Sequence, residues 1–477
     1  MFIGRKEELN ILEKLYNSNK FEFGYLYGQR RIGKTTLVDE FSNNKKSLVF
    51  FASDSDDSTI RNDFSITLSK KIKQDGISFN SWDSFFEAIS SYFGDENGVM
   101  VIDEYPNILL TRDGKRKKTD FVSKLQNAID RKFSKQKFLL ILTGSNVSFM
   151  EKEVNDTKAP LYERNTFQLM LSKFEWNDAL KMLEGMNDID KIKTLCLTDT
   201  FPFYISNIDV NMSFEQNLNR LFFNREALFT NDPSKLMSSE IEASGLYAGI
   251  MKNISNGINT ISALAKVLNM ETSVISIYLD KLIENRVVSK HYMFNSKRNT
   301  YYKIIDRMTS FYFRFISSNN ENIKLGYGSL IKKEYEDSID SFIHHSFEDV
   351  CITYLKDKSK KGELNGLFLD FQNYTVEKSM LGRSIEIDIV SESKNKLLIG
   401  ECKLTNQKKS IDVLKKMEEN TTVPPFNNYN KIDYYIFSTS GFNDSLINNK
   451  KDNVFLIDLN EMLKWLLTKY LMIKRNY

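Results

Sequence analysis

Cysteine, histidine and proline are scarce in this chain of 477 residues, which has 3 cysteines, 3 histidines and 6 prolines. The cysteines, Cys196, Cys351 and Cys402, are far apart and form no C-x-x-C pair, which argues against a disulfide framework or a thiolate zinc site. Three histidines are too few for a histidine-rich metal centre. No apolar run approaches the ~20 residues that span a bilayer, and the N-terminus shows no signal-peptide core. We therefore expect a cytoplasmic protein without a membrane partner.

A strong excess of either charge is also missing. The chain has 66 basic and 63 acidic residues, and the net charge of +3 is too small to indicate a nucleic-acid partner by itself. Its hydrophobic content of 41% is ordinary for a globular protein. A chain of this length is expected to form several domains.

The stretch GQRRIGKTT has the spacing G-x-x-x-x-G-K-[ST] of a phosphate-binding loop. The apolar run Phe23–Tyr27 before it is typical of a buried strand, and Lys34–Phe41 is typical of a helix. Lys34 is expected to reach the β- and γ-phosphates, and the Thr35 hydroxyl to ligate Mg²⁺. An ordinary glycine-containing turn is the alternative, but the strand–loop–helix context favours nucleotide. The sequence thus predicts a site for ATP or GTP made of Gly28, Gln29, Arg30, Arg31, Ile32, Gly33, Lys34, Thr35 and Thr36.

A second apolar stretch, Val99–Ile102, ends in Asp103 and Glu104. Downstream of a phosphate loop, the aspartate at such a strand end helps to hold Mg²⁺, and a following glutamate can polarise the attacking water. The next strand, Phe138–Leu142, ends in Thr143–Asn146, whose polar side chains would lie beside the γ-phosphate. Alternating strands and helices predict a parallel sheet covered on both faces, with ligand at the carboxyl ends of its strands.

Three helical segments followed by two short strands predict a winged helix-turn-helix. Its last two helices are expected over Ile261–Leu268 and Thr272–Asn285, and its strands over Val287–Met293 and Thr300–Ile304. Contact with DNA and packing against protein both remain open for this module. Likewise, the basic stretch Arg112–Lys118 is either a nucleic-acid contact or a solvated loop. The candidate nucleic-acid contacts in the turn between the strands are Lys290, Lys297 and Arg298.

Two strand-like stretches near the C-terminus, Ile385–Val390 and Leu397–Lys403, are joined by a polar turn. Each carries a carboxylate at a corresponding point, and a lysine follows the second carboxylate by two residues, on the same face. A glutamate on the preceding helix, Phe342–Leu355, can add a third carboxylate. Such a set suits a hard divalent metal and a water nucleophile, whereas solvent-exposed charges on a hairpin are the alternative. The candidates are Asp388, Glu401, Lys403 and Glu348.

The order of these motifs resembles the archaeal-type ATPases of the STAND class of P-loop NTPases, whose members carry a winged helix and a C-terminal nuclease-like domain. The resemblance covers most of the chain. It implies an α/β multidomain fold with a P-loop parallel sheet, a helical lid, a winged helix-turn-helix and a restriction-endonuclease-like α/β domain. The stretches that carry it are FIGRKEEL, GQRRIGKTT, VIDEYP, LTGSNVSFM, PLYERNTF, YYKIIDRMTSFYFRF, SFEDVCITYL, EIDIV and IGECK.

From this resemblance we expect five segments along the chain. They are an ATPase core in residues 1–170, a helical lid in 171–238, the winged helix-turn-helix in 239–316, a linker in 317–336 and the nuclease-like domain in 337–477.

The resemblance also implies roles for residues outside the phosphate loop. Arg5 would pack near the nucleotide base, Ser145 would lie in the sensor region, and Arg164 would contact the γ-phosphate. Two positions depart from the family pattern. Glu163 stands where the family has a glycine, and the Gly-x-Pro motif that helps to close on nucleotide reads Thr200–Pro202, with only Pro202 kept.

In the C-terminal region the resemblance is to the PD-(D/E)xK nuclease fold. Asp388, Glu401 and Lys403 match its core, and Glu348 matches its frequent helix acid. The match implies that Asp388 and Glu401 hold Mg²⁺ and that Lys403 stabilises charge or orients the attacking water. Many relatives of this fold bind nucleic acid without cutting it, whereas the complete set of residues favours cleavage.

The expected function is therefore an ATP-binding and ATP-hydrolysing protein that gates a Mg²⁺-dependent nuclease acting on nucleic acid, with DNA as the expected substrate. Homo-oligomerisation in some nucleotide state is expected. By analogy, the combination suits defence against phage or other foreign DNA. The alternative is an ATP-dependent switch or DNA-binding regulator whose nuclease-like domain binds without cleaving, and a third is a winged helix that serves only assembly.

Overall fold

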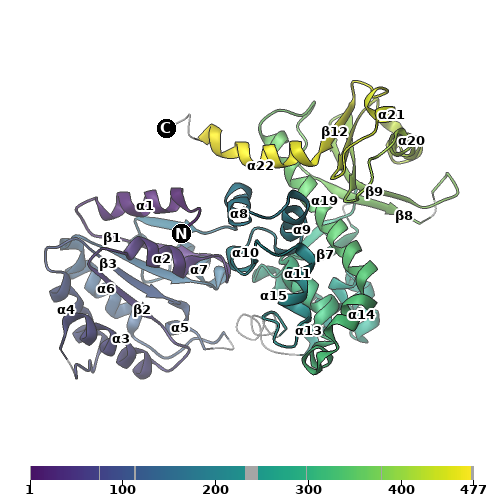
Figure 1. Cartoon of the computed structure of the whole chain (residues 1–477). Coiled ribbons are helices and arrows are strands. Elements are labelled where there is room, and N and C mark those ends of the chain that lie inside the picture. The colour runs from purple at the N-terminus through teal and green to yellow at the C-terminus, as the bar shows by residue number, and fades with distance from the viewer. Residues whose placement is uncertain are drawn as a thin grey trace.

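The structure, a computed structural model, describes residues 2–74, 76–111, 114–230, 245–296, 298–377 and 379–473, without the side chains of 467–473. Figure 1 shows a sheet domain at the N-terminal end, a helical centre and a second sheet domain at the C-terminal end. The last helix, α22 (Leu459–Ile473), runs from the second sheet domain back toward the first and packs against α8 (Trp176–Met182). No helix in the described ranges is long and apolar enough to cross a membrane.

The N-terminal sheet has five parallel strands in the order β2-β3-β4-β1-β5. Its three central strands are buried along their whole length, as expected for strands covered on both faces. The predicted parallel sheet is thus confirmed. Its strands are β1 (Glu22–Tyr27), β2 (Ser47–Phe51), β3 (Gly98–Asp103), β4 (Phe138–Gly144) and β5 (Phe167–Met170).

Helices cover both faces of this sheet. Alternate residues of each strand point to opposite faces, so one face packs against the first two helices and the other against later helices. On the first face lie α1 (Lys6–Tyr16) and α2 (Lys34–Ser42). The second face and its edge carry α3 (Asp57–Ile72), α4 (Trp82–Phe93), α5 (Pro106–Leu109), α6 (Phe121–Arg131), η1 (Phe133–Lys135) and α7 (Val147–Asn155).

Short helices form the centre of the molecule. The predicted helical lid begins with α8 and contains α9 (Asp188–Thr198), α10 (Pro202–Ser206), α11 (Phe214–Leu218) and the π-helical turn η2 (Asn219–Phe223). Residues 231–244 lie outside the described ranges, and the first helix after them is α13 (Gly245–Ser255).

Three helices and a β-hairpin, which we call the hairpin module, span residues 245–304. The module has the predicted order of elements, and the helix and strand bounds agree with prediction to within one residue at each end. After α13 come α14 (Ile261–Leu268), α15 (Thr272–Glu284), β6 (Val288–Tyr292) and β7 (Thr300–Ile304).

The segment predicted as a linker, 317–336, is helical instead. Ile323 and Ile331 are buried in it, because it packs against the η2 turn. Apolar residues at helical spacing within a polar stretch are the reason that it folds against the centre. The helical elements between the hairpin module and the C-terminal domain are α16 (Arg307–Phe311), η3 (Tyr312–Ile316), α17 (Asn320–Asn322), η4 (Ile323–Tyr327) and α18 (Gly328–Glu334).

The C-terminal domain is a mixed five-stranded sheet in the order β12-β11-β10-β9-β8. Strands β8, β9 and β10 are antiparallel neighbours, whereas β10, β11 and β12 are parallel. A long helix, α19 (Glu336–Lys360), precedes the sheet. The remaining elements are β8 (Gln372–Val376), β9 (Ile385–Ser393), β10 (Lys396–Lys403), α20 (Ile411–Asn420), η5 (Phe426–Asn428), β11 (Lys431–Ser438), α21 (Asp444–Ile447), β12 (Val454–Asp458) and α22.

One apolar core runs through the middle of the molecule. It includes Leu37 and Leu139 of the N-terminal domain, Phe222 and Phe311 of the centre, and Phe437 of the C-terminal sheet. The outer face of each sheet has a separate core. The centre therefore joins the two sheet domains through continuous packing. Close-packed interiors transmit strain, so a conformational change in one sheet domain can alter the packing of the other.

Candidate functional site

The phosphate loop lies between the end of β1 and the start of α2. Gly33 has φ 88°, a left-handed conformation that favours glycine, and a Cβ on Gly28 would lie 2.6 Å from the Leu171 carbonyl oxygen. Lys34 is buried, and its Nζ donates to the carbonyl oxygens of Gly28 at 2.8 Å and Gln29 at 3.1 Å. The lysine is therefore folded over the loop, where it can turn toward a phosphate.

The predicted Mg²⁺ ligands meet at the loop. Thr35 Oγ1 donates to Asp103 Oδ2 at 3.0 Å. Thr143, at the end of β4, donates from its hydroxyl to the other Asp103 oxygen. Hard oxygen ligands of this kind fit Mg²⁺. From the sequence, Thr143 was expected at a polar strand end. Its hydrogen bond to Asp103 was not predicted.

The predicted water-polarising residue and the predicted sensor touch each other. The Ser145 hydroxyl donates to the two Glu104 carboxylate oxygens at 2.8 Å, and its backbone N–H donates to Oε2 at 3.3 Å. Glu104 has φ 55°, a left-handed conformation that is uncommon outside glycine. Ser145 thus orients Glu104 at the carboxyl edge of the sheet, next to Asp103. Of the other loop residues, Ile32 is buried and Thr36 is exposed on α2.

Arg5 supports the phosphate loop from behind. Its guanidinium donates to the carbonyl oxygens of Ile32 at 2.8 Å and Ser172 at 2.6 Å, and it lies over the Phe174 ring with 5.0 Å to the centroid. Only 8% of Arg5 is exposed. In this structure Arg5 is a positioning residue that ties the loop to the segment after β5.

Replacing Arg5 by alanine is expected to lower the free energy of unfolding by ~3 kcal/mol, because buried carbonyls lose charged donors. ATP affinity should fall as well, since the loop loses its support. Urea denaturation and ATP titration measure the two effects. Lys14→Ala, an exposed change on α1, is the control. Equal stability of Arg5→Ala and the wild type would contradict the assigned role.

Arg164 does not lie at the nucleotide edge. It forms a two-pronged ion pair with Asp130, at 2.8 and 3.0 Å, and the nearby Thr166 N–H donates to the Phe23 carbonyl at the start of β1. Arg164 therefore lies near the amino-terminal ends of the strands, whereas the phosphate loop lies at their carboxyl ends. In this arrangement Arg164 does not approach the γ-phosphate on its own chain. Glu163 has φ 61°, which explains why a glycine suits that position in the family.

A chain of side-chain contacts leads from the phosphate loop into the centre. Pro202 of α10 lies beside the loop: a Cβ added to Gly33 would be 3.9 Å from the Cβ of Pro202. Arg31 Nη1 donates to the hydroxyl oxygen of Tyr204 at 2.7 Å, and the same hydroxyl donates its proton to the Asp306 carboxylate. No role was predicted for either residue: Tyr204 lies in no motif, and Asp306 belongs to the stretch YYKIIDRMTSFYFRF without a task assigned to it.

The same chain continues to the C-terminal domain. Asp306 caps α16 by accepting from the backbone N–H groups of its second and third residues at 2.9 and 3.3 Å. The next residue, Arg307, lies 3.6 Å from Asp349 of α19, and Lys303 of β7 lies 3.8 Å from the same aspartate. Asp349 directly follows Glu348. A second contact joins the loop to the hairpin module: Gln29 Nε2 donates to the Arg286 carbonyl at 2.9 Å.

In the C-terminal domain, Asp388, Glu401 and Lys403 come together as predicted. Lys403 Nζ lies 2.5 Å from Glu401 Oε1 and 3.9 Å from Asp388 Oδ2. The Cys402 backbone N–H donates to Asp388 Oδ2 at 2.7 Å. This group, with Glu348, is called the acidic centre below.

Burial and the neighbouring carboxylates raise the pKa values of two acids in the acidic centre. Desolvation and then repulsion by Asp388 raise the pKa of Glu348 to about 9, and desolvation and then Glu401 raise the pKa of Asp388 to about 6. Asn373 of β8 donates to Glu348 Oε2 at 2.7 Å and to the Asp388 carbonyl at 2.9 Å. Asn373, which the sequence did not mark, therefore holds the helix acid beside the strand acid.

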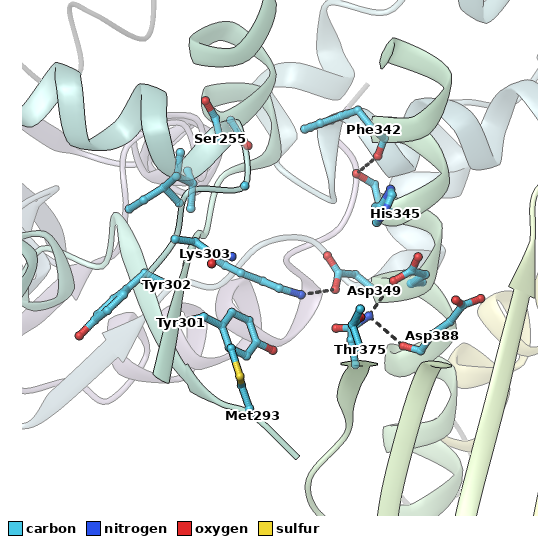
Figure 2. Close-up of a pocket in the computed structure, with 18 of the residues that line it drawn as sticks. Ser255, Met293, Tyr301, Tyr302, Lys303, Phe342, His345, Asp349, Thr375 and Asp388 are labelled. Atoms are coloured by element: carbon cyan, nitrogen blue, oxygen red, sulfur yellow. Dashed lines mark hydrogen bonds and ion pairs between the residues drawn. The ribbon is translucent and has the colours of Figure 1, made fainter. Parts of the chain in front are cut away.

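A cavity of about 710 Å³, the interdomain cleft, lies between the hairpin module and the C-terminal domain. One wall carries Glu348 and Asp388. The opposite wall carries Tyr301 and Lys303 of the hairpin, and Figure 2 shows Lys303 reaching across to Asp349. Two residues of the acidic centre, Glu348 and Asp388, thus face a cleft that both domains build.

The predicted nucleic-acid contacts on the hairpin lie elsewhere. Lys290 and Arg298 are exposed and do not line the cleft, and Lys297 lies outside the described residues. In the basic stretch 112–118, Arg116 pairs with Glu153 at 2.9 Å, which favours a structural loop, while 112 and 113 are not described.

The matches to protein families agree with this site. Residues 2–205 match the family described as an ATPase domain predominantly from Archaea. The N-terminal part of the chain is an archaeal-type ATPase. The phosphate loop, Lys34 and Asp103 lie within these matched residues. Residues 312–417 match a family described as Archaea bacterial proteins of unknown function.

Related proteins and structures add further likenesses. An uncharacterized protein of Methanocaldococcus jannaschii is 25% identical over 401 residues, which cover 83% of this chain and 85% of that protein. An uncharacterized ATP-binding protein of the same organism is 54% identical over 46 residues, 10% of this chain and 78% of that protein. The structure of a Walker-type ATPase of Pyrococcus abyssi matches with a TM-score of 0.50 and 18% identity, covering 65% of this chain and 96% of that one. This last likeness concerns the fold.

Proposed function

We propose that this ATPase belongs to the STAND class and controls a metal-dependent nuclease in its own C-terminal domain, with DNA as the expected substrate. The observation that carries the proposal is the convergence of Asp388, Glu401 and Lys403 in a largely buried centre, of which Asp388 lines the interdomain cleft. Ionisable groups whose pKa values are shifted by burial and by one another beside a cleft are candidates for a functional site.

The topology of the C-terminal domain supports a nuclease-like assignment. A helix, α19, precedes three antiparallel strands, β8 to β10, and α20 then connects β10 to the parallel strand β11. Asp388 and Glu401 lie on the paired strands β9 and β10, one residue beyond the paired residues Ile389 and Gly400. The acids that the PD-(D/E)xK resemblance names thus lie on a helix and on two neighbouring strands that follow it.

The donor set fits Mg²⁺. Asp388 and Glu401 supply hard carboxylate oxygens, and Mg²⁺ is commonly bound through one or two carboxylates with water completing the shell. When bound, the ion would supply charge stabilisation and an activated water. Glu401 and Asp388 raise the pKa of Lys403 although burial opposes them, so the lysine stays charged and can stabilise negative charge on a phosphate.

At the ATP site the residues have separable tasks. Lys34 neutralises phosphate charge, Thr35 and Asp103 would hold Mg²⁺, and Glu104, oriented by Ser145, polarises the water that attacks the γ-phosphate. A Mg²⁺ ion there would supply charge neutralisation across the phosphates.

Control of the C-terminal domain by ATP is supported by two contacts of the phosphate loop. Arg31 reaches α16 through Tyr204 and Asp306, and Gln29 reaches the hairpin module at Arg286. Nucleotide that reorganises the loop would bias both contacts. We take the hairpin module to be the predicted winged helix. Assembly into a homo-oligomer and a role in defence against foreign DNA remain parts of this proposal.

Replacing Tyr204 by phenylalanine is expected to uncouple ATP binding from DNA binding. The ring stays, but the hydroxyl that links Arg31 to Asp306 is lost. In typical allosteric proteins one ligand changes the affinity for another by roughly 5- to 150-fold. In Tyr204→Phe the ratio of DNA affinities with and without ATP should therefore fall toward one. ATP affinity itself should change little. Fluorescence anisotropy of labelled DNA at saturating ATP measures the ratio. Tyr429→Phe, which removes a hydroxyl bonded to Glu392 in the C-terminal domain, is the control. An unchanged ratio in Tyr204→Phe would refute this route.

The test of the proposed function is a cleavage assay. The full chain is incubated with plasmid, single-stranded DNA and RNA, with Mg²⁺ or Mn²⁺, and with or without ATP. We expect metal-dependent cleavage whose rate changes with ATP. If nothing is cut under any of these conditions, the nuclease proposal fails.

A second function, nucleic-acid binding without cleavage, is favoured by two observations. Among the described residues, no group of three or more His, Cys, Asp or Glu side chains is arranged to hold a metal ion. Lys403 also occupies Glu401 in a close ion pair. Under this alternative the protein is an ATP-dependent switch or DNA-binding regulator. Binding of nucleic acid in the assay, without cleavage in either metal, would support it.

A further inference from the structure

The size of the interdomain cleft limits what it can hold. At about 710 Å³ it is in the range of cavities that enclose one drug-sized ligand. A duplex is usually read by protein elements that enter its grooves, of which the major groove alone is about 12 Å wide. The cleft is therefore too small to enclose a duplex.

The two walls of the cleft are tied together. Phe294, at the tip of the hairpin, stacks on Phe426 of the C-terminal domain with 5.8 Å between ring centroids and 25° between planes. Lys303 and Arg307 both lie within 4 Å of Asp349 on α19. These contacts hold the cleft at the width seen here.

Arg314 is a cation of the cleft wall that no acid neutralises. It lies in η3 and lines the cleft, and within the described part of the chain no carboxylate lies within 4.0 Å of its guanidinium. Its guanidinium lies over the ring of Phe315, 5.3 Å from the ring centroid. Burial lowers the pKa of Arg314, yet a guanidinium stays charged in proteins. A half-buried, unpaired cation is a site for an anion from outside the chain.

Aromatic and amide groups complete the lining. Tyr301, which is partly exposed, lines the cleft next to Lys303, and its ring stacks on His291 on one side. Asn256 and Asn299 line the cleft as well. Cations that track phosphates, together with aromatic rings and amides that meet bases, are the features by which proteins bind single strands.

We propose that the interdomain cleft binds an unpaired segment of a nucleic-acid strand, with a phosphate on Arg314 and a base against Tyr301. This inference rests on the proposed function for what happens to the strand, and it defines the substrate as single-stranded nucleic acid or an unpaired end. A strand in the cleft passes Glu348 and Asp388, which line the same cavity. Duplex enters only where it is frayed.

The test measures binding to the full chain without cleavage. Labelled oligothymidylate and oligouridylate of about 12 nucleotides, within the ~4–16 nucleotides that typical single-strand sites cover, are titrated by fluorescence anisotropy in EDTA. A duplex of the same length is compared. We expect the single strands to bind about tenfold more tightly than the duplex, and the DNA and RNA arms tell which sugar is preferred.

Arg314→Gln is expected to weaken single-strand binding about tenfold, as for loss of a charged hydrogen bond. It should also reduce the salt slope of the logarithm of affinity by about 0.7, the value for one phosphate contact on a single strand. Arg314→Lys keeps the charge and should restore most of the affinity and the slope. Arg383→Gln removes a matched arginine that pairs with Glu419 outside the cleft, and should have no effect. ATP turnover of each variant verifies folding.

The outcomes separate this inference from the nuclease proposal. Preferential, Arg314-dependent binding of single strands that are never cut with Mg²⁺ supports the inference and removes the nuclease. Duplex binding as tight as single-strand binding, or an Arg314→Gln variant with wild-type affinity and salt slope, overturns the inference even if the protein cuts DNA.

Discussion

Replacing Glu104 by glutamine is expected to lower ATP turnover by about 10²–10³-fold, the contribution of a positioned general base. The carboxylate lies beside Asp103 at the edge of the sheet and is held by the Ser145 hydroxyl at 2.8 Å. Glutamine has nearly the same shape but cannot take a proton from water. ATP binding should therefore persist, because Lys34 and the loop are unchanged.

Phosphate release at saturating ATP measures the turnover, and a fluorescent ATP analogue measures binding. Ser145→Ala should lower turnover by a smaller factor, about tenfold, because it leaves the carboxylate in place but less well oriented. Glu96→Gln, which changes a glutamate that pairs with Lys46 before β3, is the control. Wild-type turnover in Glu104→Gln would show that another group polarises the water.

Replacing Asp388 by asparagine is expected to abolish metal-dependent cleavage, with a loss of about 10³-fold or more, because a carboxylate that would hold Mg²⁺ becomes neutral. The change is also expected to remove stabilisation by Mg²⁺. A ligand at 100 times its dissociation constant stabilises the folded state by ~2.7 kcal/mol, so the wild type should melt at a higher temperature in Mg²⁺ than in EDTA. Asp388→Asn should show a smaller difference, because it loses the contribution of this site and keeps that of Thr35 and Asp103.

Glu392→Gln is the matched control for Asp388→Asn, since it changes an exposed carboxylate on the same strand, β9. It should keep both cleavage and the response to Mg²⁺. Cleavage that survives in Asp388→Asn would place the active centre elsewhere, and loss of cleavage in Glu392→Gln as well would indicate damage to the domain.

Much of the fold could be predicted from local pattern. The apolar runs that became β1, β3 and β4 are flanked by turns and helices of ordinary length, so strand–helix alternation indicated a parallel sheet. The central helices were harder to place. The segment 317–336 was expected to be a linker, but Ile323 and Ile331 find apolar partners once the chain has folded.

The candidate sites show the same division. Lys34 and Thr35 were predicted from the short, fixed spacing of the phosphate loop, and Asp103 from its place at the end of an apolar strand. By contrast, Arg164 was expected at the γ-phosphate from its place in a family motif, and the structure pairs it with Asp130 at the other sheet edge. A motif position gives the order along the chain, whereas the distance between groups depends on how the elements pack.

The sequence by itself determined the chemistry that is present: a complete phosphate loop, acids at strand ends, and a carboxylate pair with a lysine two residues on. These depend on neighbours along one strand or loop, so periodicity and spacing are enough to predict them. Only the tertiary structure decided which groups meet across long stretches of chain. Arg31 reaches Asp306 through Tyr204, and Arg314 faces a cleft shared with Asp388. Such contacts arise when a continuous core fixes the domains against each other, and no local pattern encodes them.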